Sequence, residues 1–288
     1  MIPMITMTNL HADLHLHSNA SDGTLAPADL VAHAARHGVQ MLALTDHDTT
    51  DGCAAAATAC AELGVKFVAG CELSTTWRGQ AVHVIGLWPG ATPQDSTDPL
   101  QQHMAGVRNR RRERIVEIGA RLSRRARLDG AALADQVLEG AAVPTRAHVA
   151  RQLVANGHAR DVQDAFDRYL GRGQPGHVPI EWPGLPATLA AILAAGALPV
   201  LAHPHRYKLS AGALRSLLTD FRDGGGRAME ICIGGMARSD LDRLATLARR
   251  IGLAGSCGSD FHDPAVPWNP PGRFAKLPAD IAPIAQHL

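Results

Sequence analysis

Three side chains that commonly bind metals alternate along one short apolar segment near the start of the chain. The segment reads Asp13-Leu14-His15-Leu16-His17-Ser18. If residues 10–16 form a strand, Asp13, His15 and His17 share one face, because successive side chains of a strand point to opposite sides. Burying three polar groups on one face is costly unless something pairs with them. The motif therefore predicts a metal site, although a lone histidine in an apolar segment is usually a structural core residue.

The same pattern, an apolar run that ends in a ligand-type side chain, recurs along the chain. Asp46 and His47 follow the run 41–44, Glu72 follows 65–70, His203 follows 198–202, and Asp260 and His262 follow 253–257. His83 lies inside a further run, 81–87, and fits the series if that strand is half buried. Buried parallel strands read as continuous apolar runs, and a barrel of such strands gathers functional groups at its carboxyl ends. Each residue alone could be a cap or a turn residue, but together they predict one shared site.

The order of apolar runs and helical patterns predicts an α/β fold. Seven runs are candidate strands, near residues 10–16, 41–45, 66–71, 81–87, 198–202, 228–233 and 253–257. Helical patterns alternate with these runs up to residue 88 and again from about residue 188, which is the rhythm of a mostly parallel sheet. Seven such strands would form an incomplete relative of the eight-stranded barrel.

Residues 100–172 interrupt this rhythm. They show helical patterns at 101–128, 131–138, 146–157 and 161–170, and the segment 88–99, rich in Pro, Thr and Asp, has the composition of a linker. We therefore expect a barrel domain made of residues 1–99 and 187–288. Residues 100–186 are expected to form an inserted helical domain that determines substrate specificity.

Composition excludes several classes of protein. The net charge of +1 gives no general attraction to nucleic acid or membrane, and 4% aromatic residues argue against a long stacking platform for single strands. Five cysteines without C-x-x-C spacing favour reduced thiols. Residues 1–8 lack a basic start, and apolar runs of about 18 residues are absent from the sequence. We expect a soluble, cytoplasmic protein without a membrane or a stable protein partner.

The candidate ligands are imidazoles and carboxylates, without thiolates. They are His15, His17, Asp22, Asp46, His47, Glu72, His83, His203, Asp260 and His262. One ion rarely needs more than about six ligands, so a cluster of two or three divalent ions is the economical interpretation. The donor types favour Mn, Fe or Zn. Such a cluster generates hydroxide near neutral pH and stabilises the attacking and leaving oxygens of a phosphoryl displacement. The chemistry predicts phosphoester hydrolysis.

These residues resemble the PHP (polymerase and histidinol phosphatase) phosphoesterases. The matching segments are 13–18, 21–23, 45–48, 70–72, His83, 202–204 and 258–262. The resemblance implies a distorted seven-stranded, TIM-like (β/α)7 barrel with a trinuclear centre that is usually activated by Mn²⁺. By position it implies the metal ligands His15, His17, Asp22, His47, Glu72, His83, His203, Asp260 and His262. Asp13 and Asp46 are expected behind them, and Asp22, His203 and Asp260 are expected to be catalytic.

With its insertion the chain is most similar to the stand-alone branch that includes 3′,5′-nucleoside bisphosphate phosphatases. Members of that branch release the 3′-phosphate of adenosine 3′,5′-bisphosphate to give AMP. The resemblance implies the same reaction, with a metal-bridging hydroxide as nucleophile and a nucleotide or short oligonucleotide as partner. Two other hydrolases remain open, a 5′-3′ exonuclease on short 5′-phosphorylated RNA or DNA and a histidinol phosphate phosphatase. A catalytically silent metal or nucleotide sensor is the alternative that is not an enzyme.

Nine arginines in residues 108–127 make the insertion strongly basic, although a solvated helix face is the ordinary explanation of such a run. Arg108 and Arg112 lie one turn apart and are predicted to bind a phosphate together. Arg146 and His148 follow an N-cap threonine, and a helix N-terminus favours an anion, so they are predicted to contact the non-reacting phosphate. His205 and Arg206, just after His203, are predicted beside the scissile phosphate, with a loop salt bridge as the alternative.

Overall fold

A seven-stranded sheet, curled into a nearly closed barrel, forms the centre of the computed structural model, which describes residues 11–90 and 98–288. The strands are β1 (Ala12–Leu16), β2 (Met41–Leu44), β3 (Lys66–Trp77), β4 (Gln80–Trp88), β5 (Leu198–Leu201), β6 (Ala228–Ile233) and β7 (Ala254–Gly258). They lie side by side in sequence order. All neighbours are parallel except β4, which is antiparallel to β3 and β5. The predicted seven-stranded barrel is confirmed; residues 1–8 and most of the linker lie outside the described residues.

Backbone contacts close the barrel between its first and last strands. Just beyond β7, Phe261 forms a parallel bridge with Leu16 of β1. The amide of His17 donates to the Phe261 carbonyl at 3.0 Å, and the amide of Asp260 donates to the His15 carbonyl at 2.9 Å. These bonds place two predicted ligand segments from opposite ends of the sequence next to each other.

The hairpin of β3 and β4 is longer than the sequence predicts, because β3 continues to Trp77 instead of ending near residue 71. The two strands are joined by Arg78 and Gly79, both with positive φ (47° and 77°), which is the backbone of a two-residue hairpin turn. The residues that follow Leu73 carry hydroxyl groups, so this part of the strand does not form an apolar run in the sequence. Thr75, for example, donates its hydroxyl to the Pro183 carbonyl at 2.9 Å.

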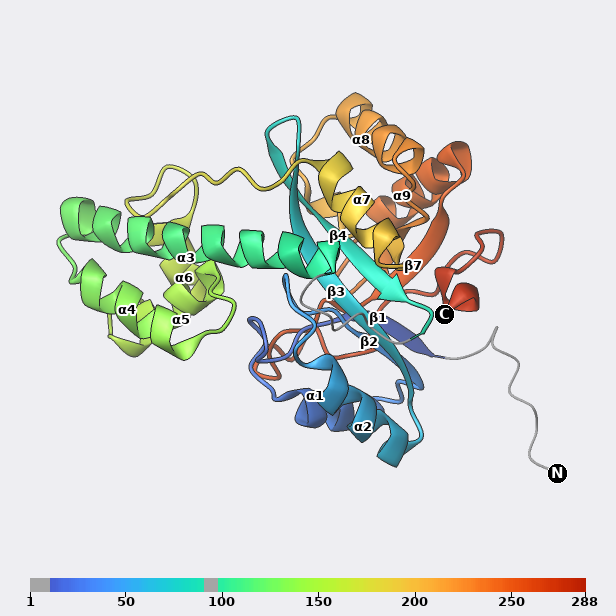
Figure 1. Ribbon diagram of the computed structural model, residues 1–288, viewed down its shortest axis with the longest axis horizontal. Coiled ribbons are helices and arrows are strands. Elements are labelled where there is room, and N and C mark those ends of the chain that lie inside the picture. Colours follow the sequence, from blue (N-terminus) through green and yellow to red (C-terminus); the bar gives the residue numbers. More distant parts are fainter. Residues whose placement is uncertain (1–10, 91–97) are drawn as a thin grey trace.

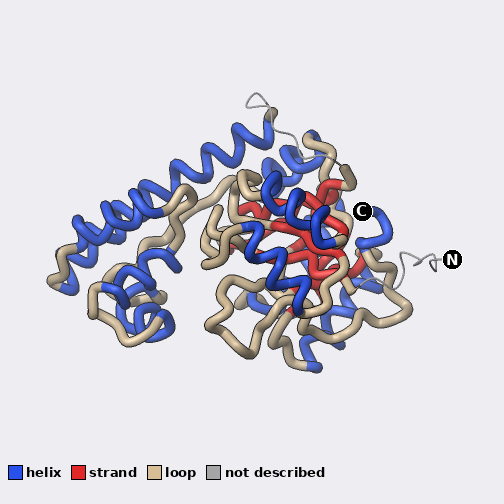
Figure 2. Tube along the Cα trace, turned by 90° about the horizontal axis from the view of Figure 1, so that it is seen from below, coloured by secondary structure: helices blue, strands red, loops and turns tan. Residues whose placement is uncertain are grey.

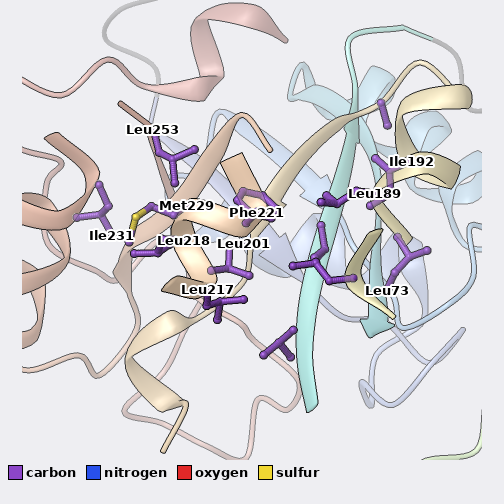
Figure 3. Close-up of a cluster of buried hydrophobic side chains, with 14 of the residues drawn as sticks. Leu73, Leu189, Ile192, Leu201, Leu217, Leu218, Phe221, Met229, Ile231 and Leu253 are labelled. Atoms are coloured by element: carbon purple, nitrogen blue, oxygen red, sulfur yellow. The ribbon is translucent and has the colours of Figure 1, made fainter. Parts of the chain in front are cut away.

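Helices cover the outside of the barrel on two sides. In Figure 1, α1 (Pro27–Arg36) and α2 (Cys53–Leu63) lie on one side of the strands, and α7 (Leu185–Ala194), α8 (Ala211–Asp223) and α9 (Arg238–Ile251) lie on the other. Short 3₁₀ turns occur at Pro204–Arg206 and Ile284–His287. Figure 3 shows the core beneath α7 and α8, where Phe221 of α8 meets Leu201 of β5 and Met229 of β6, all fully buried.

The predicted insertion consists of helices, and it stands to one side of the barrel (Figures 1 and 2). Its elements are α3 (Pro99–Ala126), α4 (Gly130–Gly140), α5 (Arg146–Ala155), α6 (Val162–Ala165) and a π-helical turn (Phe166–Leu170). Leu100 and Met104 at the start of α3 pack into the barrel core, whereas Ile118 and Leu122 near its end belong to a separate apolar cluster of the insertion. None of the helices in the described residues has the length and hydropathy needed to cross a bilayer.

A buried ion pair fastens α3 to the barrel. Arg111 of α3 contacts the Asp48 carboxylate at 2.7 Å, and the Asp48 side chain is fully buried. The same carboxylate accepts hydrogen bonds from the amide of Ser74 at 2.8 Å and from its hydroxyl at 3.0 Å. Arg111 also lies over the ring of Trp182, 5.1 Å from its centroid. One carboxylate therefore joins the loop after β2, strand β3 and helix α3.

We expect Asp48→Ala to lower the free energy of unfolding by about 3–5 kcal/mol, because removal of one partner leaves a buried charge uncompensated. Denaturant unfolding of the full chain measures this change. Asp51→Ala is the matched control, since Asp51 is exposed three residues further on, and it should stay within about 0.5 kcal/mol of wild type. Equal stabilities of the two variants would contradict the assigned role of the pair.

Candidate metal centre

The nine predicted metal ligands come from six of the seven strands or the segments that follow them. β1 and its following turn carry His15, His17 and Asp22; β2 leads to His47; β3 carries Glu72; β4 carries His83; β5 leads to His203; and β7 leads to Asp260 and His262. Glu72 lies beyond the end of β2, where it forms a parallel bridge with His47. All but His83 and His262 are buried.

The carboxylate of Glu72 lies at the centre of five imidazoles. The nearest ring nitrogens lie at 2.8 Å (His203), 3.0 Å (His83), 3.1 Å (His47), 3.3 Å (His17) and 3.4 Å (His15) from its oxygens. Glu72 is only 1% exposed. This spacing brings ligands from four other parts of the barrel to one carboxylate, as expected for a bridging ligand.

Asp22 and Asp260 extend this arrangement on either side. His262 Nε2 lies 3.3 Å from Asp22 Oδ1, and His47 Nε2 lies 3.8 Å from Asp22 Oδ2. Asp260 Oδ1 lies 3.3 Å from His15 Nε2 and 3.4 Å from His17 Nε2. Asp22 therefore shares His47 with Glu72 and adds His262, whereas Asp260 shares His15 and His17 with Glu72.

Three overlapping groups of ligand atoms are spaced for metal binding, each with all its atoms within 4.8 Å of one another. They are His17, Asp22, His47 and His262; His15, His17 and Asp260; and His47, Glu72 and His83. His203 is outside these groups but contacts Glu72 as described above. Among the buried side-chain atoms of the described residues that lack a hydrogen-bond partner, five belong to predicted ligands: His17 Nδ1, Asp22 Oδ1, His47 Nδ1, Glu72 Oε2 and His203 Nδ1. Because buried polar atoms are rarely left unpaired, this donor set fits divalent ions.

The electrostatics of the groups follow from their mutual contacts. Burial opposes the charged form of His17, yet hydrogen bonds with Asp260 and Glu72 raise its pKa to about 10. Burial likewise disfavours a charged Glu72, but the neighbouring His83 and other imidazoles hold the pKa of this carboxyl well below its usual range. Glu72 is thus ionised at neutral pH, whereas His17 holds a proton that a metal ion must displace.

Two further aspartates lie behind the ligands, where the resemblance places them. Asp13 accepts backbone hydrogen bonds from Ser259 at 2.9 Å and Gly272 at 2.7 Å. Asp46 accepts hydrogen bonds from the amide of Ser18 at 2.8 Å and from the hydroxyls of Ser18 and Ser21, both at 2.6 Å. These carboxylates are occupied by loop donors and are not members of the three groups.

The predicted substrate contacts fall into two regions. Arg108 donates to the Asp48 carbonyl at 2.8 Å beside the ligand segment of β2, whereas Arg112 is exposed. Arg146 stacks on Phe166 with the guanidinium 5.4 Å from the ring centroid. His148 accepts a hydrogen bond from the Thr145 amide at 3.1 Å, so one of its ring nitrogens caps α5.

The second region is the turn after β5, where Arg206 forms an ion pair with Asp260. The ring of His205 lies next to Arg206, and burial together with that charge lowers the pKa of His205 to about 4. The sequence left open a loop salt bridge as the role of Arg206, and the structure contains such a salt bridge. The same contact places the guanidinium of Arg206 beside the candidate ligand Asp260.

Sequence reasoning missed two residues that contact the centre from outside. Glu230, in β6, is fully buried and contacts His15 Nδ1 at 2.9 Å. Arg151, in α5, donates to the Asp22 carbonyl at 2.5 Å. The signal for Glu230 was present, because it is the one charged residue in the apolar run 228–233. Nothing in the sequence around Arg151 distinguishes it from the other arginines of the insertion.

Buried imidazoles and carboxylates at the rim of an α/β barrel define a metal-dependent hydrolase. Residues 13–181, more than half of the chain, match the family model of the PHP domain. The chain belongs to the PHP family and is a metal-dependent phosphoesterase. The predicted family is confirmed.

Relatives with known names cover nearly the whole chain. A 5′-3′ exoribonuclease of Haemophilus influenzae is 40% identical over an alignment of 276 residues that covers 94% of this chain and 97% of the relative. A 3′,5′-nucleoside bisphosphate phosphatase of Chromobacterium violaceum is 36% identical over 279 residues, 96% of this chain and 95% of the relative. A solved structure of an amidohydrolase from C. violaceum with bound sulfate matches with a TM-score of 0.87 and 36% identity, covering 96% of this chain and 95% of that one.

The raised pKa of His17 makes metal binding depend on pH. Its pKa in the folded protein, about 10, exceeds the ordinary value of 6.5. The stability that the charged ring contributes to the folded state is therefore fully present below pH 6.5 and is lost as the pH rises through 10. A divalent ion competes with this proton, so we expect the affinity for divalent metal to rise with pH and metal uptake at pH 7.5 to release protons. Titration calorimetry of metal-free protein in buffers with different ionisation enthalpies measures the release. The same affinity at every pH from 6.5 to 8.5 would contradict this prediction.

Proposed function

We propose that this phosphoesterase removes the 3′-phosphate from nucleoside 3′,5′-bisphosphates and leaves a nucleoside 5′-monophosphate. The observation that carries the proposal is a cluster of three arginines beside the metal centre. Arg111, Arg114 and Arg146 lie near enough to one another that burial and the other two charges lower the pKa of Arg114 to about 9. A second phosphate in this position would relieve their repulsion.

The positions of these arginines support a second anion site separate from the metal ligands. Arg111 is neutralised by Asp48, and Arg114 donates to the Val178 carbonyl at 2.8 Å. Within the described residues, Arg146 has its contact with Phe166 but no hydrogen bond or ion pair. Arg146 also opens α5, whose N-terminus favours an anion. A substrate with two phosphates matches a metal centre with a separate cationic site.

Under this proposal the nine predicted ligands hold two or three divalent ions, with Mn²⁺ as the expected metal. When bound, such ions polarise the phosphoryl oxygens and activate water as the nucleophile. Asp22, His203 and Asp260 hold and orient the reacting group from three sides of the centre. Arg206, held against Asp260, is placed to neutralise the scissile phosphate. Arg108 and Arg112 are proposed contacts on α3, His148 is a proposed contact in the first turn of α5, and His205 is a proposed contact in the turn after β5.

A 5′-3′ exoribonuclease activity is the second candidate, supported by the H. influenzae relative. Both reactions attack a phosphorus on the 3′ oxygen of a nucleotide that carries a 5′-phosphate, and both give a 5′-mononucleotide. The two therefore need the same pair of anion sites and differ in the group that the scissile phosphate carries on its far side. Exposed arginines at the far end of α3, such as Arg125 and Arg127, favour a longer polyanion.

A substrate panel separates these activities. Phosphate or nucleotide release by the Mn²⁺-loaded protein is measured with adenosine 3′,5′-bisphosphate, 3′-AMP, 5′-AMP, histidinol phosphate and a short 5′-phosphorylated RNA. The proposal expects the highest kcat/KM for the bisphosphate. Faster release of mononucleotides from RNA would establish the exoribonuclease instead, and a preference for histidinol phosphate would contradict both. Metal binding without turnover of any substrate would indicate a sensor.

Loss of a single proposed ligand should abolish the reaction. We expect His17→Ala and Asp260→Ala to lower kcat by more than about 100-fold, since loss of even an outer partner of a ligand costs about 10–100-fold. Circular dichroism checks that both variants are folded. Wild-type rates in folded variants would refute the site assignment.

Arg146→Ala tests the second anion site. We expect kcat/KM for adenosine 3′,5′-bisphosphate to fall by roughly 10- to 100-fold, the effect of a lost hydrogen bond to a charged group worth about 1.5–3 kcal/mol. The value for 3′-AMP, which has no 5′-phosphate, should change little. Arg250→Ala, an exposed arginine at the end of α9, is the matched control. An equal loss for both substrates would count against a 5′-phosphate site at Arg146.

A further inference from the structure

Strand β6 contributes no ligand to the metal centre, yet it carries a buried carboxylate next to it. Glu230 lies in the apolar segment Ala228–Ile233 and is 0% exposed. Burying a carboxylate is costly unless hydrogen bonds satisfy its oxygens. Both oxygens of Glu230 contact N–H groups of predicted ligand residues, one in β1 and one after β5. The two contacts indicate what Glu230 does.

The first contact determines which nitrogen of His15 faces the centre. Glu230 Oε1 lies 2.9 Å from His15 Nδ1, while His15 Nε2 lies 3.3 Å from Asp260 Oδ1. A carboxylate oxygen accepts hydrogen bonds, and the other oxygen of Glu230 already accepts the His203 amide, so this contact assigns the proton to His15 Nδ1. A neutral imidazole has one N–H, and its Nε2 lone pair is then free for a metal ion. Space for this contact depends on Gly258, where a Cβ would lie 2.4 Å from His15 Cβ and 3.1 Å from Glu230 Oε1.

The second contact holds the backbone of His203. Glu230 Oε2 accepts the His203 amide at 2.5 Å. His203 adopts a left-handed conformation (φ 30°, ψ 53°), which is unfavourable for a residue with a Cβ. That conformation places His203 Nε2 at 2.8 Å from Glu72 Oε1. The hydrogen bond that the His203 amide donates to Glu230 therefore supports a strained backbone that points this ring at the centre.

We propose that Glu230 is a positioning residue that fixes the tautomer of His15 and the backbone of His203 at the same time. The inference rests on the proposed metal centre. One carboxylate in β6 thereby orients ligands from β1 and β5, and β6 takes part in the site without binding a metal.

Glu230→Gln tests this role, because an amide has one acceptor oxygen and cannot accept from both N–H groups. If its NH₂ faces His15 Nδ1, the imidazole must move its proton to Nε2, which then cannot bind a metal. If its NH₂ faces the His203 amide, two donors oppose each other. In either orientation one ligand is lost, and we expect Mn²⁺ affinity to fall about 10- to 100-fold, or one ion per chain to be lost. Equilibrium dialysis followed by metal analysis measures both quantities.

A second readout monitors the histidine ring itself. In Zn²⁺-loaded, ¹⁵N-histidine-labelled protein, wild type should show a protected Nδ1–H proton for His15, assigned by its loss in His15→Gln. The resonance should disappear or move in Glu230→Gln. The control is Glu62→Gln, the same chemical change at an exposed position in α2, which should leave metal content and spectrum unchanged. If Glu230→Gln fails to fold, Glu230→Asp keeps the charge but is too short to reach both donors, and the same loss is expected.

The outcomes separate the inference from the proposed function. Wild-type protein that binds Mn²⁺ and releases phosphate, together with a folded Glu230→Gln of unchanged affinity, ion count and His15 resonance, would overturn the positioning role alone. Wild-type protein that binds no divalent metal would overturn both proposals. A folded Glu230→Gln with reduced metal affinity and a changed His15 resonance would support the inference.

Discussion

Glu72 imposes the constraint on which the rest of the site depends. Its carboxylate is buried, and five imidazole nitrogens lie within 3.4 Å of its oxygens. A buried carboxylate needs such partners, so the segments that carry the histidines must meet at one height of the barrel. The long β3 strand sets that height, because it continues past the point where β2 ends and pairs Glu72 with His47. The antiparallel β4 then returns alongside β3 and places His83 at the same level.

The insertion is fastened to the segments that carry the ligands. Arg111 of α3 contacts Asp48, the neighbour of His47, and Arg151 of α5 donates to the carbonyl of Asp22. A shift of the helices would therefore move two ligand segments as well as the arginines. This coupling gives a physical reason for the arginines of the insertion and the ligand segments to keep a fixed separation, which the proposed substrate with two phosphates requires.

The sequence predicts the strand count and the gathering of ligands because both depend on local order: six of the seven short apolar runs carry, or lead directly into, a side chain that can bind metal. It does not predict which arginines face the barrel. Three arginines of α3 donate to backbone carbonyls of the segment that leads back to the barrel: Arg110 to Glu181, Arg114 to Val178 and Arg121 to His177. For these three residues the basic run has a structural role. The role of Glu230 also escapes prediction, because its partners lie 27 and 215 residues away and meet it only when the barrel closes.

Three carboxylates outside the ligand set solve the same physical problem. Ligands that lie beyond the strand ends have backbone amides that the sheet cannot satisfy, and buried amides need acceptors. Asp13 accepts the amide of Ser259, next to Asp260; Asp46 accepts the amide of Ser18 in the turn before Asp22; and Glu230 accepts the amide of His203. Each carboxylate starts from a strand or strand end and reaches a loop that another strand leads into. The positions of the ligands thus depend on hydrogen bonds between a carboxylate of one strand and a loop after another strand. These bonds hold the polar groups in place at a rim that consists mainly of loops.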